Sequence, residues 1–465
     1  MLQVQENAVD GSSGFGVLDS TEHTYNDTMN ADALIDRYGD RIRYVRGLGW
    51  LVYDGTRWEK DAEADVIEFA AETMRALGKW AFDLPNSDTR KRLLAHANRS
   101  LDMRDLANMV KRAESDKRIR AKVEDFDRDP LLFNCLTGTL DLTTGTLQDH
   151  NPADFITHQS GVEYDASARS ARWEEFVLWA AKEREDLYDY LQRALGYSLT
   201  GKTSEKAFFF CYGPSGDNGK STLLEAVKFV MGSYGMTVPI ETIISKQGAS
   251  GDVSRDNVAL IGKRFIVASE PEEGQRFKMG RLKVLTGSDS MPAKALYKEA
   301  VDFVPVLKIW LSANNQPTVP ENGDAAWQRI KLIPFDAKIA KDKINRKLGE
   351  EFREDASAIL TWLVQGCWLW YTEGGLVAPD CMTEASEEYR GEQDHFAAFV
   401  SECCKPGGEI LAAHLLAAYN RWAEHPTRPE VDAVSARKLN STAVQHGYTK
   451  RDVVAGVMLV GLHLK

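Results

Sequence analysis

The residues with the clearest chemical meaning lie in a glycine-rich turn at positions 213–222. The sequence AFFFCYGPSGDNGKSTLLEAVKFVMG places this turn between an apolar run and a helical pattern of apolar residues. In that context the backbone N–H groups of the turn and of the helix N-terminus bind phosphate, while the Lys reaches the β and γ phosphates and the Ser holds Mg²⁺. The sequence therefore predicts a site for ATP and Mg²⁺. Its predicted ligands are Gly213, Gly216, Asn218, Gly219, Lys220, Ser221 and Thr222.

The turn departs from the usual spacing by one residue. In the pattern GxxxxGK[ST] the first glycine would fall at position 214, where this chain has Pro214, and Gly213 comes one residue too early. Because the flanking strand, Asn218, Gly219 and the helix are all in place, we expect a phosphate-binding loop that is one residue longer. The alternative is a glycine-rich turn before a helix that binds nothing.

A carboxylate follows the next long apolar run. In GKRFIVASEPEEG the residues 265–268 lead to Glu270. Coordination of Mg²⁺ and activation of a water molecule both require a carboxylate beside the bound phosphates, so Glu270 is the predicted catalytic acid and a metal ligand. The sequence leaves open which of Glu270, Glu272 and Glu273 is the general base and which assists the metal. The alternative is that Glu270 has no catalytic role and only marks the point where a strand meets a solvated turn.

Two more polar residues follow in order along the chain. An apolar strand at 306–313 ends in NNQP, which places Asn314 where its amide could orient the attacking water between the γ phosphate and Glu270. In GDAAWQRIKLIPF, Arg329 precedes another apolar strand and could stabilise charge in trans on the ATP of a neighbouring subunit. A turn asparagine and an ordinary surface arginine are the alternatives, and the order of the motifs favours the catalytic roles.

The elements that must position these residues form an α/β unit. From about residue 207 to 335 apolar strands alternate with helices, as in a sheet domain with helical connections. We predict six segments: a disordered tail at 1–30, a mainly helical accessory domain at 31–130, a helical collar region at 131–200, the ATPase core at 201–345, a helical linker at 346–394 and a winged-helix-like domain at 395–465.

The two segments before the ATPase core contain strand patterns as well as helical ones. The sequence RYVRGLGWLVYDGTRWEKD predicts a short β-meander, and helices are expected at 62–77, 87–113 and 115–126. After Pro130, LLFNCLTGTLDLTTGTLQDHN predicts a hairpin, and residues 172–195 have apolar positions mostly at helical spacing.

Composition and charge exclude several classes of protein. The 465 residues include 43% hydrophobic and 27% charged residues and 11 Trp, as in a folded globular protein of about three domains. A formal net charge of −12 excludes a protein that coats nucleic acid with its whole surface, because phosphate binding relies on Lys and Arg. We expect no membrane partner and a cytoplasmic location, since neither a long apolar run nor a signal peptide is evident. The six scattered Cys lack the spacing of a zinc site.

The ordered motifs resemble those of the superfamily 3 helicases, and specifically the helicase part of the phage and plasmid primase-helicase family that includes the poxvirus primase-helicase. The resemblance covers about residues 133–335. It implies an AAA+-like P-loop fold that forms a ring, usually a hexamer, with ATP at the subunit interfaces. The segments that carry it are FNCLTGTLDLTTGTLQDHNP, LQRALGYSLTGKTSEKAFFFCYG, GPSGDNGKST, KRFIVASEPEEG, KVLTGSDSMPAKALYKEAVDFVP, LSANNQP and WQRIKLIPF.

The resemblance implies a role for each motif residue. Lys220 and Ser221 fall on the nucleotide motif and Glu270 on the acidic motif. Asn314 falls on the polar sensor and Arg329 on the arginine finger. The sequence WQR is a departure, because the family often has a second Arg before the finger.

In such helicases a hairpin between the acidic strand and the sensor strand projects into the ring channel and grips single-stranded DNA. The corresponding segment is about 290–304, with Lys294 and Lys298 as candidate phosphate contacts. A basic stretch within an acidic protein would focus the electrostatic field where the strand passes, and solvated surface charges are the alternative. The basic residues are Arg276, Lys278, Arg281, Lys283, Lys294 and Lys298.

The sequence thus predicts an ATP-driven replicative DNA helicase of a phage, prophage or plasmid, acting on single-stranded and forked DNA. Its partners would be further copies of itself in the ring and a separate primase or polymerase. A translocation polarity of 3′ to 5′ is implied by the resemblance alone. Relatives commonly carry an N-terminal primase domain. We expect no primase activity here, because little sequence precedes the helicase portion and no paired Asp motif follows an apolar strand.

Three other functions fit parts of the pattern. A helicase loader or ring remodeller would hydrolyse ATP without separating strands. A replication initiator or structural DNA-binding module would use nucleotide only to hold the ring together. A small-molecule kinase fits least, because it leaves the Asn and Arg motifs unexplained and no lid-like Arg cluster is evident.

Overall fold

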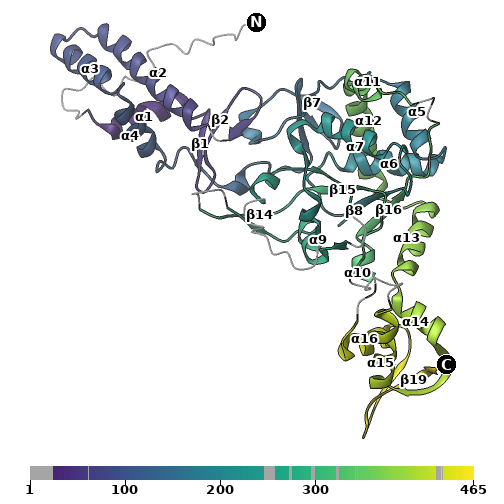
Figure 1. The fold of residues 1–465 in the computed structure, drawn as a ribbon. Coiled ribbons are helices and arrows are strands. Elements are labelled where there is room, and N and C mark those ends of the chain that lie inside the picture. The colour runs from purple at the N-terminus through teal and green to yellow at the C-terminus, as the bar shows by residue number, and fades with distance from the viewer. Residues whose placement is uncertain are drawn as a thin grey trace.

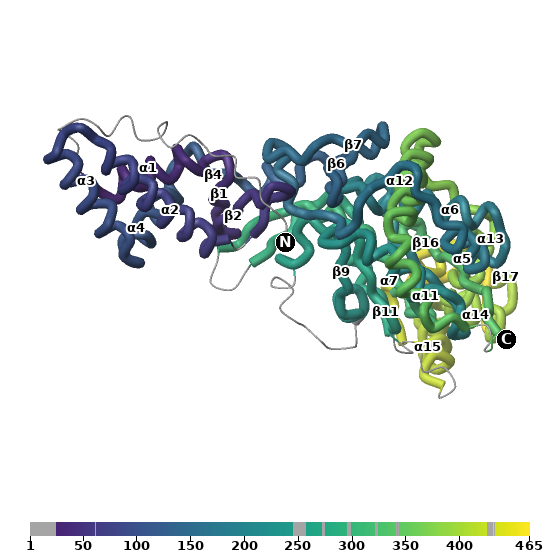
Figure 2. The backbone as a smooth tube through the Cα atoms, turned by 90° about the horizontal axis from the view of Figure 1, so that it is seen from above, coloured from purple at the N-terminus to yellow at the C-terminus, as the bar shows by residue number. Residues whose placement is uncertain are grey.

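The computed structural model describes residues 25–60, 62–245, 257–271, 275–294, 299–320, 324–340, 342, 344–425, 431 and 433–465. Figure 1 shows an α/β core with a helical N-terminal arm at one side and a small C-terminal unit below. From above, the arm extends the long axis of the molecule (Figure 2). The α/β class expected from the sequence is confirmed, and the structure shows that the central sheet is parallel. No helix within the described ranges has the length and apolar character needed to cross a bilayer.

The N-terminal arm, residues 25–121, packs helices against a small sheet. The strand order is β3-β2-β1-β4, with β1 antiparallel to β2 and parallel to β4. The first three strands form the expected β-meander. The elements of the arm are α1 (Asp27–Tyr38), β1 (Ile42–Val45), β2 (Gly49–Tyr53), β3 (Trp58–Lys60), α2 (Glu63–Phe82), α3 (Ser87–Arg99), α4 (Met103–Ala113) and β4 (Arg120–Ala121).

Helix α1 occupies part of the segment predicted as a disordered tail, residues 1–30. The side chain of Asn26 caps the helix by accepting hydrogen bonds from the N–H groups of Thr28 and Met29, at 3.0 and 3.1 Å. Apolar residues of α1 join the core of the arm. The polar residues that suggested a tail therefore form a helix N-cap, and the prediction is wrong for residues 27–30.

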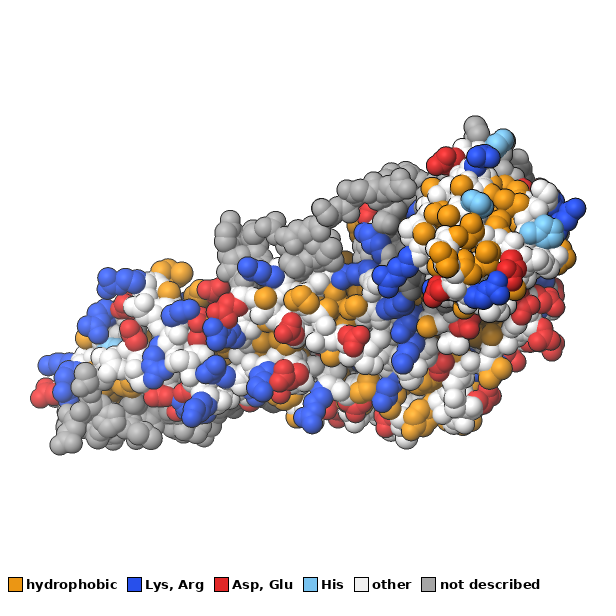
Figure 3. All heavy atoms as spheres, turned by 90° about the horizontal axis from the view of Figure 1, so that it is seen from below, with side chains coloured by type: hydrophobic (Ala, Val, Ile, Leu, Met, Phe, Trp, Pro, Cys, Tyr) orange, Lys and Arg blue, Asp and Glu red, His pale blue; other side chains and the backbone are white. Residues whose placement is uncertain are grey.

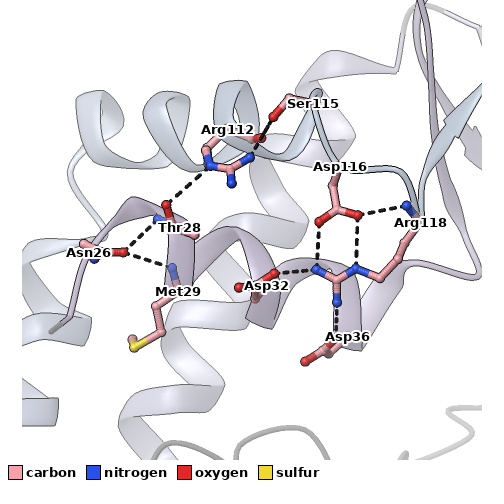
Figure 4. Close-up of polar contacts among 9 residues, drawn as sticks. All are labelled: Asn26, Thr28, Met29, Asp32, Asp36, Arg112, Ser115, Asp116 and Arg118. Carbon is pink, nitrogen blue, oxygen red and sulfur yellow. Dashed lines mark hydrogen bonds and ion pairs between the residues drawn. The ribbon is translucent and has the colours of Figure 1, made fainter. Parts of the chain in front are cut away.

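Ion pairs hold α1 against the chain that follows α4. The guanidinium of Arg118 lies between three carboxylates, those of Asp32, Asp36 and Asp116 (Figure 4). Its hydrogen bonds lower the pKa of Asp116 to about 2. Because these groups are partly exposed, the pairs fix the orientation of α1 more than they add to stability.

Two helix predictions in the arm are wrong. The single helix expected at 87–113 is two helices, because the chain leaves α3 at Ser100 and is extended at Asp102, with ψ 139°, before α4 begins. The helix expected at 115–126 is replaced by β4 and a 3₁₀ turn at Val123–Asp125. There the backbone pairs with β1, which removes it from helical hydrogen bonding.

A three-stranded antiparallel sheet connects the arm to the core. Its order is β5-β6-β7, and its first two strands form the hairpin expected after Pro130. Ser170 begins the next helix by accepting a hydrogen bond from the N–H of Trp173 at 3.1 Å. The elements are β5 (Leu132–Cys135), β6 (Gly138–Asp141), β7 (Thr146–Gln148), α5 (Ala171–Ala180) and α6 (Glu185–Tyr197).

The core is a five-stranded parallel sheet with the order β16-β8-β15-β11-β9. Strands β8 and β15 are continuous runs of buried residues, as expected where helices or loops cover both faces. The strands end level, because Tyr212 lies opposite Ala313 and Pro334. The elements are β8 (Phe208–Tyr212), α7 (Lys220–Met231), β9 (Gly235–Thr237), β11 (Phe265–Ser269), β15 (Lys308–Ala313) and β16 (Ile330–Pro334).

One hydrophobic core joins residues from the predicted collar, ATPase core and helical linker, from Phe133 to Met382. Two glycines let α6 and α12 cross closely. A Cβ on Gly196 would lie 2.2 Å from the N atom of Cys367, and one on Gly366 would lie 2.0 Å from the carbonyl oxygen of Gln192. The helices after the sheet are α11 (Leu348–Glu354), α12 (Ala356–Glu373) and α13 (Asp380–Glu392).

The other face of the sheet packs on a second core, which contains the hairpin expected at 290–304. Phe208 and Phe210 belong to this core, whereas Phe209 and Cys211 belong to the first. The hairpin is the antiparallel pair β13 (Met291–Ala293) and β14 (Val301–Phe303). Further elements here are β10 (Ile244–Ser245), β12 (Arg276–Phe277), α9 (Met279–Leu285) and α10 (Asp324–Trp327).

The arm contacts this hairpin directly. Arg46 forms an ion pair with Glu299, in which Nη2 donates to Oε1 at 2.8 Å. A Cβ on Gly47, which has φ +86°, would lie 2.4 Å from Cγ1 of Val301. The turn between β1 and β2 therefore rests against β14 without room for a side chain.

The C-terminal unit, residues 395–465, has its own hydrophobic core. Three helices pack with an antiparallel sheet of order β17-β19-β18. The elements are α14 (His395–Cys403), β17 (Cys404–Leu411), α15 (Ala412–Ala423), α16 (Ala436–Gln445), β18 (Thr449–Val453) and β19 (Gly456–Leu464). The winged-helix assignment of this unit stays a prediction.

Candidate nucleotide-binding site

Two of the three predicted catalytic residues, Glu270 and Asn314, lie with the phosphate turn at the carboxyl edge of the parallel sheet. Gly213 follows β8, Glu270 follows β11 and Asn314 follows β15. Strand β15 lies between the other two and pairs in parallel with each. Ligands of open α/β sheets bind outside the carboxyl ends of the strands, so the topology brings the three motifs to one edge.

Glycines and an asparagine shape the turn between β8 and α7, residues 213–219. Gly219 caps α7 with φ +85°, a conformation that favours glycine. A Cβ on Gly213 would lie 2.4 Å from the carbonyl oxygen of Phe335. The amide of Asn218 donates to the carbonyl oxygens of Ser215 and Phe335, at 2.6 and 3.2 Å. These bonds close the longer turn onto the end of β16.

The backbone of the turn leaves donors available for an anion. None of the N–H groups from 215 to 222 donates a hydrogen bond to another described residue. Those of Lys220, Ser221 and Thr222 belong to the first turn of α7, where an α-helix offers no acceptor. Asp217 precedes them with φ +59°. A helix N-terminus that follows left-handed residues is a backbone geometry that binds phosphate.

Lys220 connects this turn to the sensor strand. Its side chain is buried, and Nζ donates to the carbonyl oxygen of Gly213 at 3.0 Å, to Oδ1 of Asn218 at 2.9 Å and to Oδ1 of Asn314 at 3.0 Å. Burial lowers the pKa of Lys220, while Cys211 and Glu270 oppose the shift. A buried ammonium with neutral partners alone is costly, so a phosphate group would complete its coordination.

Glu270 has an unusual backbone conformation. Its φ is +57°, which is uncommon for a residue other than glycine, and its N–H donates to the carbonyl oxygen of Ser312 at 3.0 Å. This bond holds the residue beside the end of β15, and its side chain is exposed at the same edge. Strained residues of this kind cluster at functional sites.

The oxygen atoms at this edge suit Mg²⁺. Ser221 supplies a hydroxyl and Glu270 a carboxylate, and Mg²⁺ prefers one or two such protein ligands with waters and phosphate oxygens in the remaining positions. In the described part of the chain, no three His, Cys, Asp or Glu side chains are grouped so that they could hold a metal ion. The donor set therefore fits a metal that arrives with a nucleotide. Glu272 and Glu273 lie outside the described residues.

Arg329 lies at the opposite edge of the sheet. It precedes β16, whose first residue, Ile330, pairs with Phe208 at the start of β8. A strand of five residues is about 17 Å long, and this length separates Arg329 from the turn at 213–219. Its Nη1 donates to Oγ1 of Thr286 at 2.9 Å. The fold therefore keeps Arg329 away from the turn of its own chain.

Helix α5 packs against Gly219 of the turn, and no sequence motif predicts this contact. A Cβ on Gly219 would lie 3.0 Å from Trp179 and 3.3 Å from Phe176. Both aromatic residues precede the turn by about 40 positions in sequence. Their apolar spacing predicts a helix but says nothing of what that helix covers.

A cavity of about 630 Å³ opens beside Ser221 and Thr222 on the first turn of α7. Its other wall is α11 with the residues just before it, including Arg346 and Arg353. Motif reasoning missed this wall, because it lies after the last strand of the sheet. The pair of arginines there is the signal that could have found it.

Of the two predicted DNA-binding lysines, the structure describes one. Lys294 follows β13 and is exposed, whereas Lys298 lies outside the described residues. Two of the neighbouring cations are used within the fold, because Lys278 donates to the carbonyl oxygen of Glu241 and Arg281 donates to Asn257.

Comparison with known protein families gives two matches. Residues 31–180 match the family described as D5 N terminal like. Residues 211–329 match a family of unknown function, DUF5906, and this range contains the turn, Glu270, Asn314 and Arg329.

Relatives of this chain include viral proteins named as helicases. It is 28% identical over 299 residues to "Putative helicase L207/L206" of Acanthamoeba polyphaga mimivirus, an alignment that covers 60% of this chain and 31% of the relative. It is 25% identical over 257 residues to "Putative helicase 022R" of Frog virus 3 (isolate Goorha), covering 50% of this chain and 26% of the relative. The aligned part thus spans less than a third of each relative.

Among solved structures, the apo structure of the NrS-1 C terminal region aligns with 95% of this chain and 100% of its own, at 9% identity and a TM-score of 0.47. The two family matches place a D5-type segment before the turn and a DUF5906 segment over the ordered motifs. In its N-terminal part the chain thus matches the D5-type family model, and over about half of its length it is similar to viral proteins named as putative helicases.

Proposed function

We propose that this chain is the motor of an ATP-driven DNA helicase. The observation that carries the proposal is the position of Lys220, whose ammonium joins the phosphate turn to Asn314 through neutral oxygens only. A bound γ phosphate would contact both the turn and the sensor strand through this one group. Loss of the γ phosphate on hydrolysis would break this connection between the turn and the sensor strand. Nucleotide-driven motors change the position of neighbouring elements in this way.

Each residue at the carboxyl edge has a distinct part in the proposed reaction. The free N–H groups of the turn and Lys220 bind the phosphates, and Ser221 with Glu270 holds Mg²⁺. Glu270 also accepts the proton of the attacking water, which Asn314 orients. The cavity beside Thr222 takes the nucleoside, with the arginines of its far wall near the α phosphate.

We propose that the active form is a ring, because Arg329 is too far from the turn of its own chain to act there. A ring with ATP between subunits brings the Arg329 edge of one subunit to the carboxyl edge of the next. The hairpin β13–β14 would then face the channel, with Lys294 and Lys298 on single-stranded DNA. We further propose that the ring is a hexamer and that it moves along the strand from 3′ to 5′. We propose a phage, prophage or plasmid as its source and the bacterial cytoplasm as its location.

The decisive experiment is ATP-dependent strand separation on a forked DNA by the wild type and Lys220→Ala. We expect unwinding and ATP hydrolysis to fall at least about 100-fold in the variant, because the ammonium beside the phosphate turn is lost. Lys202→Ala is the matched control, since Lys202 is exposed before β8 and away from the turn. Equal unwinding by the wild type and Lys220→Ala would refute the motor.

The same assay separates the competing functions. Hydrolysis by the wild type without strand separation would identify a loader or remodeller. DNA binding without any hydrolysis would identify an initiator or structural module. Primer synthesis on a single-stranded template would contradict the absence of primase activity and would leave the helicase assignment unaffected.

A further inference from the structure

A second cavity, of about 450 Å³, lies between the C-terminal unit and the core. One wall is α16 with the residues just before it, and the opposite wall includes Arg276 of β12 and the segment 318–320 of the core. Figure 1 shows α16 on the side of the C-terminal unit that faces the core. The cavity is therefore distinct from the carboxyl edge of the sheet.

Cations and neutral polar groups line this cavity. Arg276 comes from the core, and Arg437 and Lys438 come from α16. None of the described residues that line it is Asp or Glu, although the chain has 69 acidic residues. Lys and Arg side chains also gather on the lower surface of the core beside the C-terminal unit (Figure 3). The cavity and its rim thus form a positive field that attracts anions.

The groups contributed by α16 have helical spacing. Lys438, Ser441, Thr442 and Gln445 share one face of the helix and all line the cavity. The hydroxyl of Ser435 caps the helix by accepting a hydrogen bond from the N–H of Lys438 at 3.3 Å. Hydroxyl and amide groups beside Lys and Arg are typical of contacts to phosphate oxygens that carry no sequence information.

We propose that this cavity binds the phosphate backbone of single-stranded DNA, as a second DNA site separate from the hairpin. The inference rests on the proposed helicase function, which supplies the strand. A single strand fits better than a duplex, because Thr318 and Val319 of the core stand across the cavity from the cationic face of α16. That face cannot enter a duplex groove about 12 Å wide.

Binding in this cavity is independent of base sequence. The aromatic residues at its floor, Phe396 and Tyr419, are only 3% and 5% exposed. They therefore offer no face on which a base could stack, and stacking is the usual further source of affinity for single strands. The interaction is then carried by charge, and salt weakens it strongly.

The test is fluorescence anisotropy of a labelled oligo(dT) with the full-length double variant Arg437→Gln/Lys438→Gln across a series of salt concentrations. We expect the affinity to fall about 10-fold and the slope of log affinity against log salt to shrink by about 1.4, twice the value of about 0.7 per phosphate on a single strand. The control Lys405→Gln/Arg421→Gln removes the same charge from the C-terminal unit at exposed positions outside the cavity, and should bind as the wild type does.

A second variant guards against misfolding. Gln445→Glu keeps the shape of the side chain and places an anion in the cavity, so it should weaken oligo(dT) binding while ATP hydrolysis without DNA stays at the wild-type level. Wild-type affinity in both cavity variants would overturn the inference. So would a loss confined to a labelled duplex, which would instead place duplex DNA on this face.

A variant in the hairpin tests the proposed helicase function separately from the second DNA site. If Lys294→Gln weakens binding and the cavity variants do not, the helicase proposal stands and the second site is wrong. If the wild type binds no single-stranded DNA and hydrolyses no ATP, the proposed function itself fails.

Discussion

Lys220 and Lys308 are both buried lysines whose hydrogen-bond partners are neutral oxygens, but their surroundings differ. Lys308 is the first residue of β15, where its Nζ donates to the carbonyl oxygen of Val306 at 3.0 Å and lies over the ring of Tyr197. Burial lowers its pKa well below the usual range. Lys220 has equally neutral partners but stands beside N–H groups that no described residue accepts. The free backbone N–H groups around Lys220 therefore distinguish the proposed nucleotide-binding lysine from the structural Lys308.

The conformation of Glu270 leads to a prediction for Glu270→Gln. Glutamine keeps the side-chain shape and the N–H bond to Ser312, but it can neither accept a proton nor bind Mg²⁺ as a carboxylate does. ATP hydrolysis should fall about 100-fold or more, while binding of a fluorescent ATP analogue remains within a few-fold of the wild type. Hydrolysis at the wild-type rate would move the catalytic role to Glu272 or Glu273.

His158 makes the stability of the chain depend on pH. It is buried, and its Nδ1 lies 2.8 Å from Oγ1 of Thr157, which in turn bonds to the carboxylate of Asp127. Burial lowers the pKa of His158 to about 4, with Lys60 and Lys263 acting in the same direction and Asp127 against it. The unfolded chain, with a pKa near about 6.5, therefore binds more protons between these values, and stability falls as the pH is lowered through that window.

The expected loss between about pH 7.5 and about pH 5 is about 2 kcal/mol. Chemical denaturation at the two pH values measures it, and His158→Asn should reduce the loss, whereas the exposed control His414→Asn should not. Lys263, whose pKa burial lowers to about 8, titrates above this window. An unchanged pH dependence in His158→Asn would show that the imidazole is protonated in the folded chain.

At the scale of elements, the strands and the turn could be predicted because each carries its signal locally. Apolar runs that end in a Gly-rich turn, in Glu270 or in Asn314 report strands and the edge at which they finish. The break at Asp102 and the pairing of β4 were missed, because both depend on contacts with segments far away in sequence. The segment 346–394, expected to be a helical linker, contains α11, α12 and α13, but that expectation does not reveal that α12 shares the core of the sheet.

The crossing of α6 and α12 gives a prediction at this scale. Gly196→Ala would place a methyl group 2.2 Å from the backbone of Cys367, so we expect a loss of about 2–3 kcal/mol in stability, typical of overpacking. Gly349→Ala is the matched control, because a Cβ on Gly349 in α11 would meet nothing within 4 Å. That change should be neutral or stabilise the chain by up to about 1 kcal/mol. Thermal denaturation of the two variants tests the contrast, and equal midpoints would contradict the crossing.

At the scale of the whole molecule, the position of Arg329 predicts complementation between subunits. Arg329→Ala and Lys220→Ala should each abolish hydrolysis alone, since one lacks the trans residue and the other the phosphate contact. Mixed subunits would restore some interfaces that contain Arg329 from one chain and Lys220 from the next. Hydrolysis by the mixture should therefore exceed that of either variant at the same total concentration. A mixture that stays inactive would remove Arg329 from the catalytic site.

The contact between the arm and the hairpin β13–β14 determines how a movement of one would be passed to the other. A methyl group on Gly47 would not fit beside Val301, whereas the ion pair of Arg46 and Glu299 is exposed and therefore weak. If the hairpin moved toward the arm, the contact of Val301 with Gly47 would force the arm to move with it. If the hairpin moved away, only the exposed ion pair of Arg46 and Glu299 would resist the separation. The contact between the β1–β2 turn and β14 would therefore transmit a push of the hairpin to the arm but not a pull.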